Sequence, residues 1–341
     1  MDLFAFTRAL VDLDSTTGNE QPVVDYLFTC LSSLASRHNG RLERQTAAPA
    51  RDNLFLAFGD PVVTLSTHLD TVPPFFSSSE DATHIHGRGS CDAKGIVASM
   101  VHSAESLLHQ GTRNFALLFV VGEERDSAGA TAAAAAPRGS RFLINGEPTE
   151  NRLALGSKGV LRYEIISRGK LAHSAYPKLG HSAIHSLLDA LAEIRAIPLP
   201  SDRLLGNATL NVGTIHGGRA PNVVADDARA EIMFRLVSDP ADLRLAVAQT
   251  AEKHKVQARE VLFNPAVHLN ALSDLPTTVV AFATDIPAFN GAWGRPYLIG
   301  PGSIHVAHTA EECIPKRELT QAVAIYSQMV RQLLVSGGVP S

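Results

Sequence analysis

The stretch VVTLST, residues 62–67, decides the fold of this chain. It is a short, mostly apolar and β-branched run without strict alternation. Two further runs of this kind follow, FALLFVV (115–121) and RFLI (141–144). Strands that are buried on both faces have this sequence pattern, and such strands are typical of parallel sheets covered by helices. The three runs therefore predict the centre of an α/β domain.

The segments around these runs have the apolar spacing of helices. One of them is an alanine-rich run, and alanine is the best helix former, so a helix is expected there too. We predict helices in residues 2–14, 19–35, 95–111, 127–136 and 318–334. Helices alternating with buried strands support the α/β class.

From about residue 157 the pattern changes to alternating strands separated by amphipathic helices. The predicted order is strand–helix–strand–strand–helix–strand, which is a small α+β, ferredoxin-like arrangement. Its segments are 160–169, 182–197, 208–218, 226–237, 239–255 and 256–263. We therefore expect a catalytic domain of residues 1–156 and 267–341, interrupted by an inserted domain of residues 157–266.

The composition excludes several classes of protein. The 341 residues are 45% hydrophobic and 19% charged, as in a globular protein with a sizeable core, and the net charge of −4 offers no basic field for nucleic acid. No apolar stretch approaches the roughly 20 residues that a membrane helix needs. The N-terminus lacks the pattern of an export signal. Three widely spaced cysteines argue against a disulfide framework, so a cytoplasmic location is expected.

Acids and a histidine follow each of the three buried runs. His68 and Asp70 follow the first, Glu123 and Glu124 follow the second, and Glu147 follows the third. In open α/β sheets, ligands bind beyond the carboxyl ends of the strands. Each residue alone could be an ordinary surface residue, but together they indicate a site at one edge of the sheet.

Two glycine-rich loops add to this set. Asp92 lies in GRGSCDAKG (87–95), where it could be a helix cap, and GPGSIHVAHTAEE (300–312) contains His305 and His308. Converging carboxylates repel one another, and bound cations remove that repulsion. Imidazole and carboxylate ligands without paired cysteines suit zinc or a related transition metal, and two such ions about 3.5 Å apart form a hydrolytic centre.

Seven motifs in order resemble the dinuclear zinc amidohydrolases that include acetylornithine deacetylase, succinyl-diaminopimelate desuccinylase and carboxypeptidase G. The resemblance covers nearly the whole chain. It implies a zinc-peptidase-like catalytic domain with a mostly parallel central sheet, and an inserted lid and dimerisation domain. The motifs are HLD (68–70), GRGSCDAKG (87–95), GEER (122–125), NGEPT (145–149), GKLAHSAYP (169–177), NVGTIHGGRAPN (211–222) and GPGSIHVAHTAEE (300–312).

The resemblance also implies a role for each residue of the site. Two divalent ions, zinc with cobalt or manganese as possible replacements, would be bridged by Asp92. His68 and Glu147 would complete one metal site, and Glu124 and His308 would complete the other. Asp70 would hold the His68 imidazole. Glu123 would be the general base that takes a proton from a water bridging the ions, so that hydroxide attacks the amide carbonyl. A cis peptide between Asp92 and Ala93 is expected.

The inserted domain is expected to contribute to catalysis. In the resembling enzymes, a histidine matched by His173 polarises the scissile carbonyl in the active site of the partner subunit, which implies a homodimer. The positions expected to bind substrate are Arg235, Asn222, Gly302 and Ser303. His305 has no matched role. Ala225 and Met233 depart from the family pattern near the substrate loop and leave the specificity open.

The function expected from the resemblance is hydrolysis of the amide bond of an N-acylated amino acid, most like acetylornithine deacetylase. Desuccinylase, dipeptidase or carboxypeptidase, and hydrolase of a carrier-protein-linked amino acid are alternatives with the same chemistry. A non-catalytic binding protein would be expected to have lost the base or a ligand, and none is lost here. A nucleotide-binding P-loop is excluded because Lys94 is not followed by Ser or Thr.

Overall fold

The computed structural model describes residues 2–338, and their contacts divide the chain into two compact units. The first unit comprises the chain up to Leu155, Leu269–Thr278, and the chain from Thr284 on. The second comprises Gly156–His268 and Val279–Ala283. The short segment Val279–Ala283 thus packs with the second unit, although the sequence pattern groups it with the catalytic domain.

The first unit is built on a sheet with the strand order β1-β2-β6-β3-β7-β19-β8. Its central strands are parallel: β3 pairs with β6 and β7, and β7 pairs with β19. The mostly parallel central sheet is therefore confirmed, while the pairings at both edges are antiparallel. The strands are β1 (Arg41–Ala48), β2 (Arg51–Phe58), β3 (Val63–His68), β6 (Phe115–Val120), β7 (Phe142–Asn145), β8 (Leu153–Ser157) and β19 (Arg295–Leu298).

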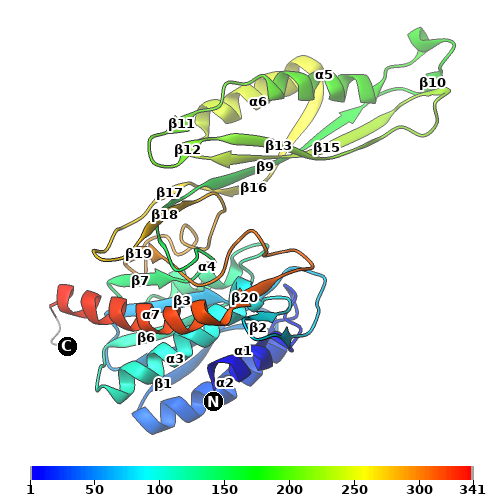
Figure 1. The fold of residues 1–341 in the computed structure, drawn as a ribbon. Coiled ribbons are helices and arrows are strands. Elements are labelled where there is room, and N and C mark those ends of the chain that lie inside the picture. Colours follow the sequence, from blue (N-terminus) through cyan, green and yellow to red (C-terminus); the bar gives the residue numbers. More distant parts are fainter. Residues whose placement is uncertain (1, 339–341) are drawn as a thin grey trace. The chain divides into compact units, whose positions relative to one another are not determined.

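Both faces of this sheet are covered, as the composition of the central strands predicts. In β6, Phe115, Leu117 and Phe119 belong to one buried cluster, which includes residues of four helices. The residues between them face a second cluster with α4 and Trp293. The helices are α1 (Leu3–Val11), α2 (Gln21–His38), α3 (Gly95–His109), α4 (Ala128–Ala135) and α7 (Lys316–Ser336), and all five were predicted (Figure 1).

A small antiparallel sheet, β20-β5-β4, holds the segment that precedes α3. Its strands are β4 (Ser79–Glu80), β5 (His84–His86) and β20 (Cys313–Pro315). Between β5 and α3, residues Ser90–Lys94 form a kinked turn in which Asp92 and Ala93 have non-helical backbone angles. The peptide bond between Asp92 and Ala93 is cis, which confirms that expectation.

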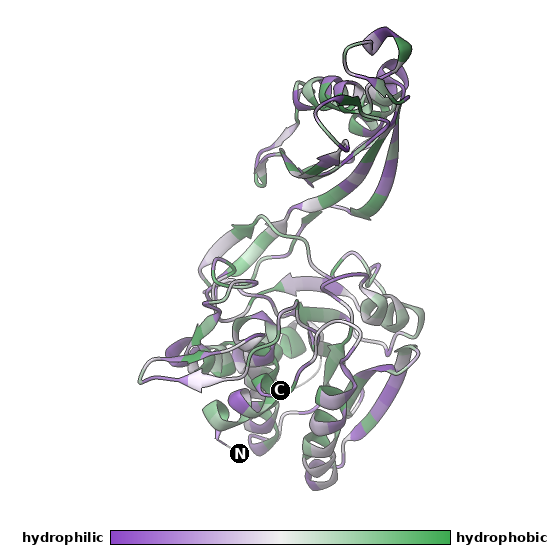
Figure 2. Cartoon of the chain, turned by 90° about the vertical axis from the view of Figure 1, so that its right-hand side faces the viewer, coloured by the Kyte–Doolittle hydropathy of each residue, from purple (hydrophilic) through white to green (hydrophobic). Residues whose placement is uncertain are grey.

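The second unit has the predicted strand–helix–strand–strand–helix–strand order. Its four-stranded antiparallel sheet has the order β13-β15-β9-β16. Hydrophobic and hydrophilic residues alternate along these strands (Figure 2), because one face packs on two helices in a separate hydrophobic cluster. The elements are β9 (Gly159–Arg168), α5 (Ala183–Arg195), β13 (Thr209–Gly217), β15 (Asp227–Leu236), α6 (Ala241–His254) and β16 (Val256–Asn264).

Short strands complete the chain. They are β10 (Ala172–His173), β11 (Ser201–Asp202), β12 (Gly206–Asn207), β14 (Val223–Val224), β17 (Val267–His268) and β18 (Thr277–Val280). Of these, β10 pairs with β14, so the loop that carries His173 lies against the segment just before β15. Among residues 2–338, no helix is long and apolar enough to span a membrane.

Candidate metal centre

Three adjacent parallel strands bring the predicted ligands to one edge of the central sheet. His68 is the last residue of β3, Glu124 follows β6, and Glu147 follows β7. Because parallel strands end at the same edge, these side chains are delivered to one place. Asp92 reaches the same place from the start of α3, and His308 reaches it from the loop between β19 and β20.

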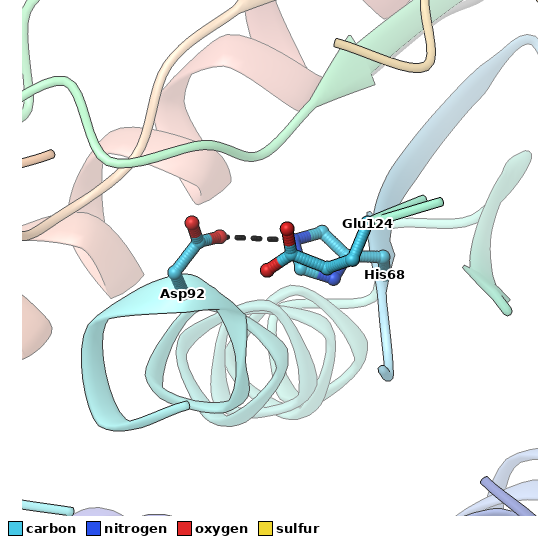
Figure 3. A group of neighbouring side chains, drawn as sticks. All are labelled: His68, Asp92 and Glu124. Atoms are coloured by element: carbon cyan, nitrogen blue, oxygen red, sulfur yellow. Dashed lines mark hydrogen bonds and ion pairs between the residues drawn. The ribbon is translucent and has the colours of Figure 1, made fainter. Parts of the chain in front are cut away.

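The geometry is centred on Asp92, whose two carboxylate oxygens each lie near a different histidine. Oδ1 is 2.9 Å from Nε2 of His68, and Oδ2 is 3.5 Å from Nε2 of His308. Nε2 of His308 is also 2.9 Å from Oε1 of Glu124. Ligand atoms of His68, Asp92 and Glu124 all lie within 4.8 Å of one another (Figure 3). This set of nitrogen and oxygen donors fits divalent transition-metal ions.

Asp70 is fully buried and supports the loop after β6 more directly than it supports His68. Its Oδ1 accepts hydrogen bonds from the backbone N–H groups of Gly122 (2.9 Å) and Glu123 (3.0 Å), and its Oδ2 accepts one from Glu124 (3.2 Å). The ring Nδ1 of His68 is 2.9 Å from the backbone carbonyl of Asp70 and 3.6 Å from its carboxylate. The backbone carbonyl, rather than the carboxylate, is therefore the near partner of the imidazole.

A second buried side chain, Arg51, contacts the same loop. Arg51 pairs with the buried Glu20 at 2.7 Å, and its guanidinium lies 3.5 Å from Asp126. Gly122 has φ +83°, and a Cβ there would lie 2.4 Å from Nη2 of Arg51. Only glycine combines this backbone conformation with this close approach. The turn that presents Glu123 and Glu124 is thus fixed by its surroundings.

The acids of the site are crowded, and their pKa values show it. Burial raises the pKa of Glu123 well above its usual range, and the charge of Glu147 adds to the effect. Burial also raises the pKa of Glu147, where the charge of Asp92 contributes. Bound cations would relieve this repulsion, which agrees with a metal centre.

The pKa values of the two histidines are raised as well, and in their case this favours the charged form. Hydrogen bonds with Asp92 and Glu124 raise the pKa of His308 to about 10. Burial opposes protonation of His68, but the nearby carboxylates of Asp70 and Asp92 outweigh it and raise its pKa. Burial alone would raise the pKa of Asp92, yet the same hydrogen bonds with His308 and His68 hold it below its usual range. The raised pKa values of the histidines thus favour a positive charge beside these carboxylates, as a bound cation would also supply.

One buried acid near the site was not identified from the sequence. Asp285 is 2% exposed, and burial raises its pKa to about 7. Its charge contributes to the raised pKa values of Glu123 and Glu147, so it lies in their neighbourhood. It occurs in ATDIPAF (283–289), outside every motif quoted above, and no local pattern distinguishes it from a helix cap.

The predicted substrate-binding positions in the first unit have partners within the chain. The backbone N–H of Gly302 donates to Glu318 (2.7 Å), and the hydroxyl of Ser303 donates to Glu150 (2.9 Å). Both donors would have to exchange these partners before they could bind a substrate carboxylate. His305 is exposed, and nothing in its surroundings assigns it a role.

In the second unit, His173 and Asn222 are brought together, whereas Arg235 lies far from them. His173 is exposed on β10, and the carbonyl of Asn222 accepts a hydrogen bond from the next residue, Ser174. Arg235 is half-buried near the other end of β15, eight positions from Asp227, where that strand begins. At about 3.3 Å per residue this is roughly 26 Å, more than one small substrate can span.

Known proteins resemble this chain in sequence. The sequence pattern of Peptidase family M20/M25/M40 matches residues 64–332. A Peptidase M20 domain-containing protein of Schizosaccharomyces pombe is 36% identical, over 96% of this chain and 84% of its own length. A probable carboxypeptidase of Aspergillus clavatus is 35% identical, over 97% of this chain and 82% of its own.

Solved structures share the fold. A metallo-carboxypeptidase of the M20 family from Sulfolobus solfataricus superimposes with a TM-score of 0.80 at 15% identity. The alignment covers 98% of this chain and 100% of that one. At this identity the likeness concerns the fold alone.

Proposed function

Because this chain belongs to Peptidase family M20/M25/M40 and is a metal-dependent amidohydrolase, we propose that it removes the C-terminal residue from short peptides at a two-metal centre. The observation that carries the proposal is the position of Asp92, which has one carboxylate oxygen near each of the two histidines. A carboxylate placed in this way is suited to bridging two ions.

The proposed ligand set consists of three acids and two histidines that converge at the edge of the sheet. Asp92 would bridge, His68 and Glu147 would hold one ion, and Glu124 and His308 would hold the other. Zinc suits these donors, and cobalt or manganese could replace it. Bound ions would acidify water and polarise the scissile carbonyl. Glu123 is proposed to accept the proton of the attacking water and deliver it to the leaving amine.

Arg235 is proposed to bind the terminal carboxylate of the peptide. Its side chain is half-buried, and it forms no ion pair within residues 2–338, so a guanidinium suited to a carboxylate is available. Asn222, which lies beside His173, is proposed to contact the same substrate from a second copy of the chain. Gly302 and Ser303 would join only after releasing Glu318 and Glu150.

His173 is proposed to polarise the carbonyl in the active site of a second copy of the chain. The spacing along β15 supports this, because one substrate cannot touch both Arg235 and His173 of the same second unit. A homodimer in which each copy completes the other's site would bring the two residues to one substrate. The homodimer and a cytoplasmic location stay predictions.

The choice of peptide substrates departs from the activity first expected from the motifs. The relatives described above are named as peptidases, which favours peptides over N-acetylornithine. Both substrate types present an amide next to a free carboxylate, so the same groups could bind either. The acyl side of the bond is what distinguishes them.

A substrate panel on metal-loaded enzyme tests the proposal. The protein is stripped with a chelator, reloaded with Zn²⁺ or Co²⁺, and assayed on dipeptides, tripeptides, the same peptides with amidated C-termini, N-acetylornithine and N-succinyl amino acids. We expect activity only after reloading, the highest kcat/KM on peptides with a free C-terminus, and little cleavage of the amidated forms. Full activity in the stripped sample would refute metal dependence. Preference for N-acetylornithine would instead restore the deacetylase function.

A further inference from the structure

A buried carboxylate holds the loop that carries Asp92. Glu312 is 1% exposed, and its Oε1 accepts hydrogen bonds from three backbone N–H groups of that loop. These are Gly89 (2.9 Å), Cys91 (3.2 Å) and Asp92 itself (3.2 Å). Hydrogen bonds to an ionised acceptor are stronger than those to neutral ones. The backbone of Asp92 is therefore tied directly to a side chain that lies 220 positions away.

The second oxygen of Glu312 is bound by an equally buried cation. Nη1 of Arg88 donates to Oε2 at 2.5 Å, and Arg88 is 1% exposed. The guanidinium is itself held in place, because Nε donates to the carbonyl of Pro74 and its carbon lies 5.0 Å from the ring centre of Phe76. Each carboxylate oxygen thus has its own partner, and the buried charge is neutralised.

The same segment also links two of the proposed ligands. Glu312 comes four positions after His308, and its carbonyl accepts a hydrogen bond from the N–H of Gly87. The pairing of β20 with β5 continues this contact, with Cys313 opposite His86. The segment that follows one ligand is therefore bonded, through backbone and side chain, to the loop that carries the other.

We propose that Glu312, paired with Arg88, is a positioning residue that sets Asp92 for bridging two metal ions. The inference rests on the two-metal centre proposed above and adds a function for a pair of residues outside the ligand set. Removing the carboxylate would leave three N–H groups without their acceptor and free the loop to move. Asp92 would then lose the placement that puts one oxygen near each histidine. Outer partners of this kind change metal affinity or activity by about 10–100-fold.

The variant Glu312→Gln tests this with little change in shape. An amide has one acceptor oxygen, but the site needs two, one for the loop and one for Arg88. We expect the affinity for Zn²⁺, measured by competition with a chromophoric chelator, to fall at least about tenfold. Amide hydrogen exchange in residues 89–92 of the metal-free protein should become faster. The control is Glu311→Gln, the same chemical change at the exposed neighbouring residue, which should alter neither measurement.

A second variant, Arg88→Met, distinguishes the effect of positioning Glu312 from the effect of charge on zinc affinity. Removing a cation near a cation site should tighten zinc binding if only charge matters. Loss of the anchor for Glu312 should weaken it if positioning matters, and we expect the weaker binding. If Glu312→Gln does not fold, the zinc affinity of Arg88→Met still tests the positioning role.

These experiments separate failure of the positioning role from failure of the proposed metal centre. Wild-type protein that binds no zinc would contradict the metal centre itself. Wild-type protein that binds zinc while Glu312→Gln binds it equally well, with unchanged exchange in residues 89–92, would overturn the positioning role alone. A lowered melting temperature of Glu312→Gln with unchanged zinc affinity would overturn it too, because it would show a purely structural pair. Tighter zinc binding by Arg88→Met would do the same.

Discussion

The carboxylate of Asp70 accepts a hydrogen bond from the backbone N–H of Glu123 at 3.0 Å, across 53 positions of sequence. The contact exists because β3 and β6 are parallel neighbours whose ends coincide, with His68 opposite Val120. Asp70 lies just past one strand end, and Glu123 lies just past the other. One buried acid therefore places the proposed general base and, through the next N–H, the proposed ligand Glu124.

Asp70→Asn should reduce both catalysis and metal binding. Asparagine has a single acceptor oxygen, so the three N–H groups that Asp70 holds cannot all keep their partner. We expect kcat/KM and zinc affinity to fall by about 10–100-fold. Thr17→Val is the matched control, because it removes only the hydroxyl that donates to Oδ2 of Asp70 at 2.8 Å. Its effect should be much smaller. Wild-type kinetics and zinc affinity in Asp70→Asn would show that the loop does not depend on this carboxylate.

Glu123→Gln should nearly abolish turnover while the metal content stays normal. A general base contributes roughly 10²–10⁴ to the rate, and this substitution leaves all five proposed ligands in place. The checks are kcat on the best peptide and the metal content of the purified protein. Glu124→Gln, the same change one residue on, should instead lose metal. The reverse pattern, with metal lost only in Glu123→Gln, would exchange the two roles.

Zinc binding should release protons, and its apparent affinity should rise with pH. In the metal-free protein the pKa of His308 is raised to about 10, so at pH 7 the ring carries a proton that a cation must displace. A raised histidine pKa stabilises the metal-free fold below the ordinary histidine pKa, and this contribution is lost as the pH rises through about 10. Titration calorimetry in buffers of different ionisation enthalpy measures the protons released. Zinc affinity that stays constant between pH 6 and pH 9 would contradict the prediction.

Mixing two inactive variants should restore activity if the dimer shares its sites. His173→Ala and Glu123→Ala chains should each be nearly inactive alone. A mixed dimer with shared sites has one site with both defects and one site with neither, so part of the activity should return after subunit exchange. No recovery, with exchange demonstrated by differently tagged chains, would assign His173 to its own chain or to no catalytic role. A monomeric active enzyme would argue against sharing directly.

The elements predicted correctly from sequence are those whose pattern is local. The runs that become β3, β6 and β7 are buried throughout and rich in apolar and β-branched residues, and α5 and α6 each bury an apolar face. The pattern fails for β1, RLERQTAA, whose residues are all at least partly exposed and often charged. It becomes a strand only because β2 pairs with it. That pairing is a tertiary effect.

The sequence by itself determined which donors reach the edge of the sheet. His68, Glu124 and Glu147 each follow a buried strand, and the chemistry of such side chains at one edge already indicates a metal. Tertiary structure alone decided what holds them: that the Asp70 carboxylate binds the loop more than the imidazole, and that Glu312 meets Arg88 across 224 positions. The physical reason is that these contacts are hydrogen bonds between buried groups far apart along the chain. Local sequence sets the conformation of a segment, but partners of this kind are chosen only when the segments pack.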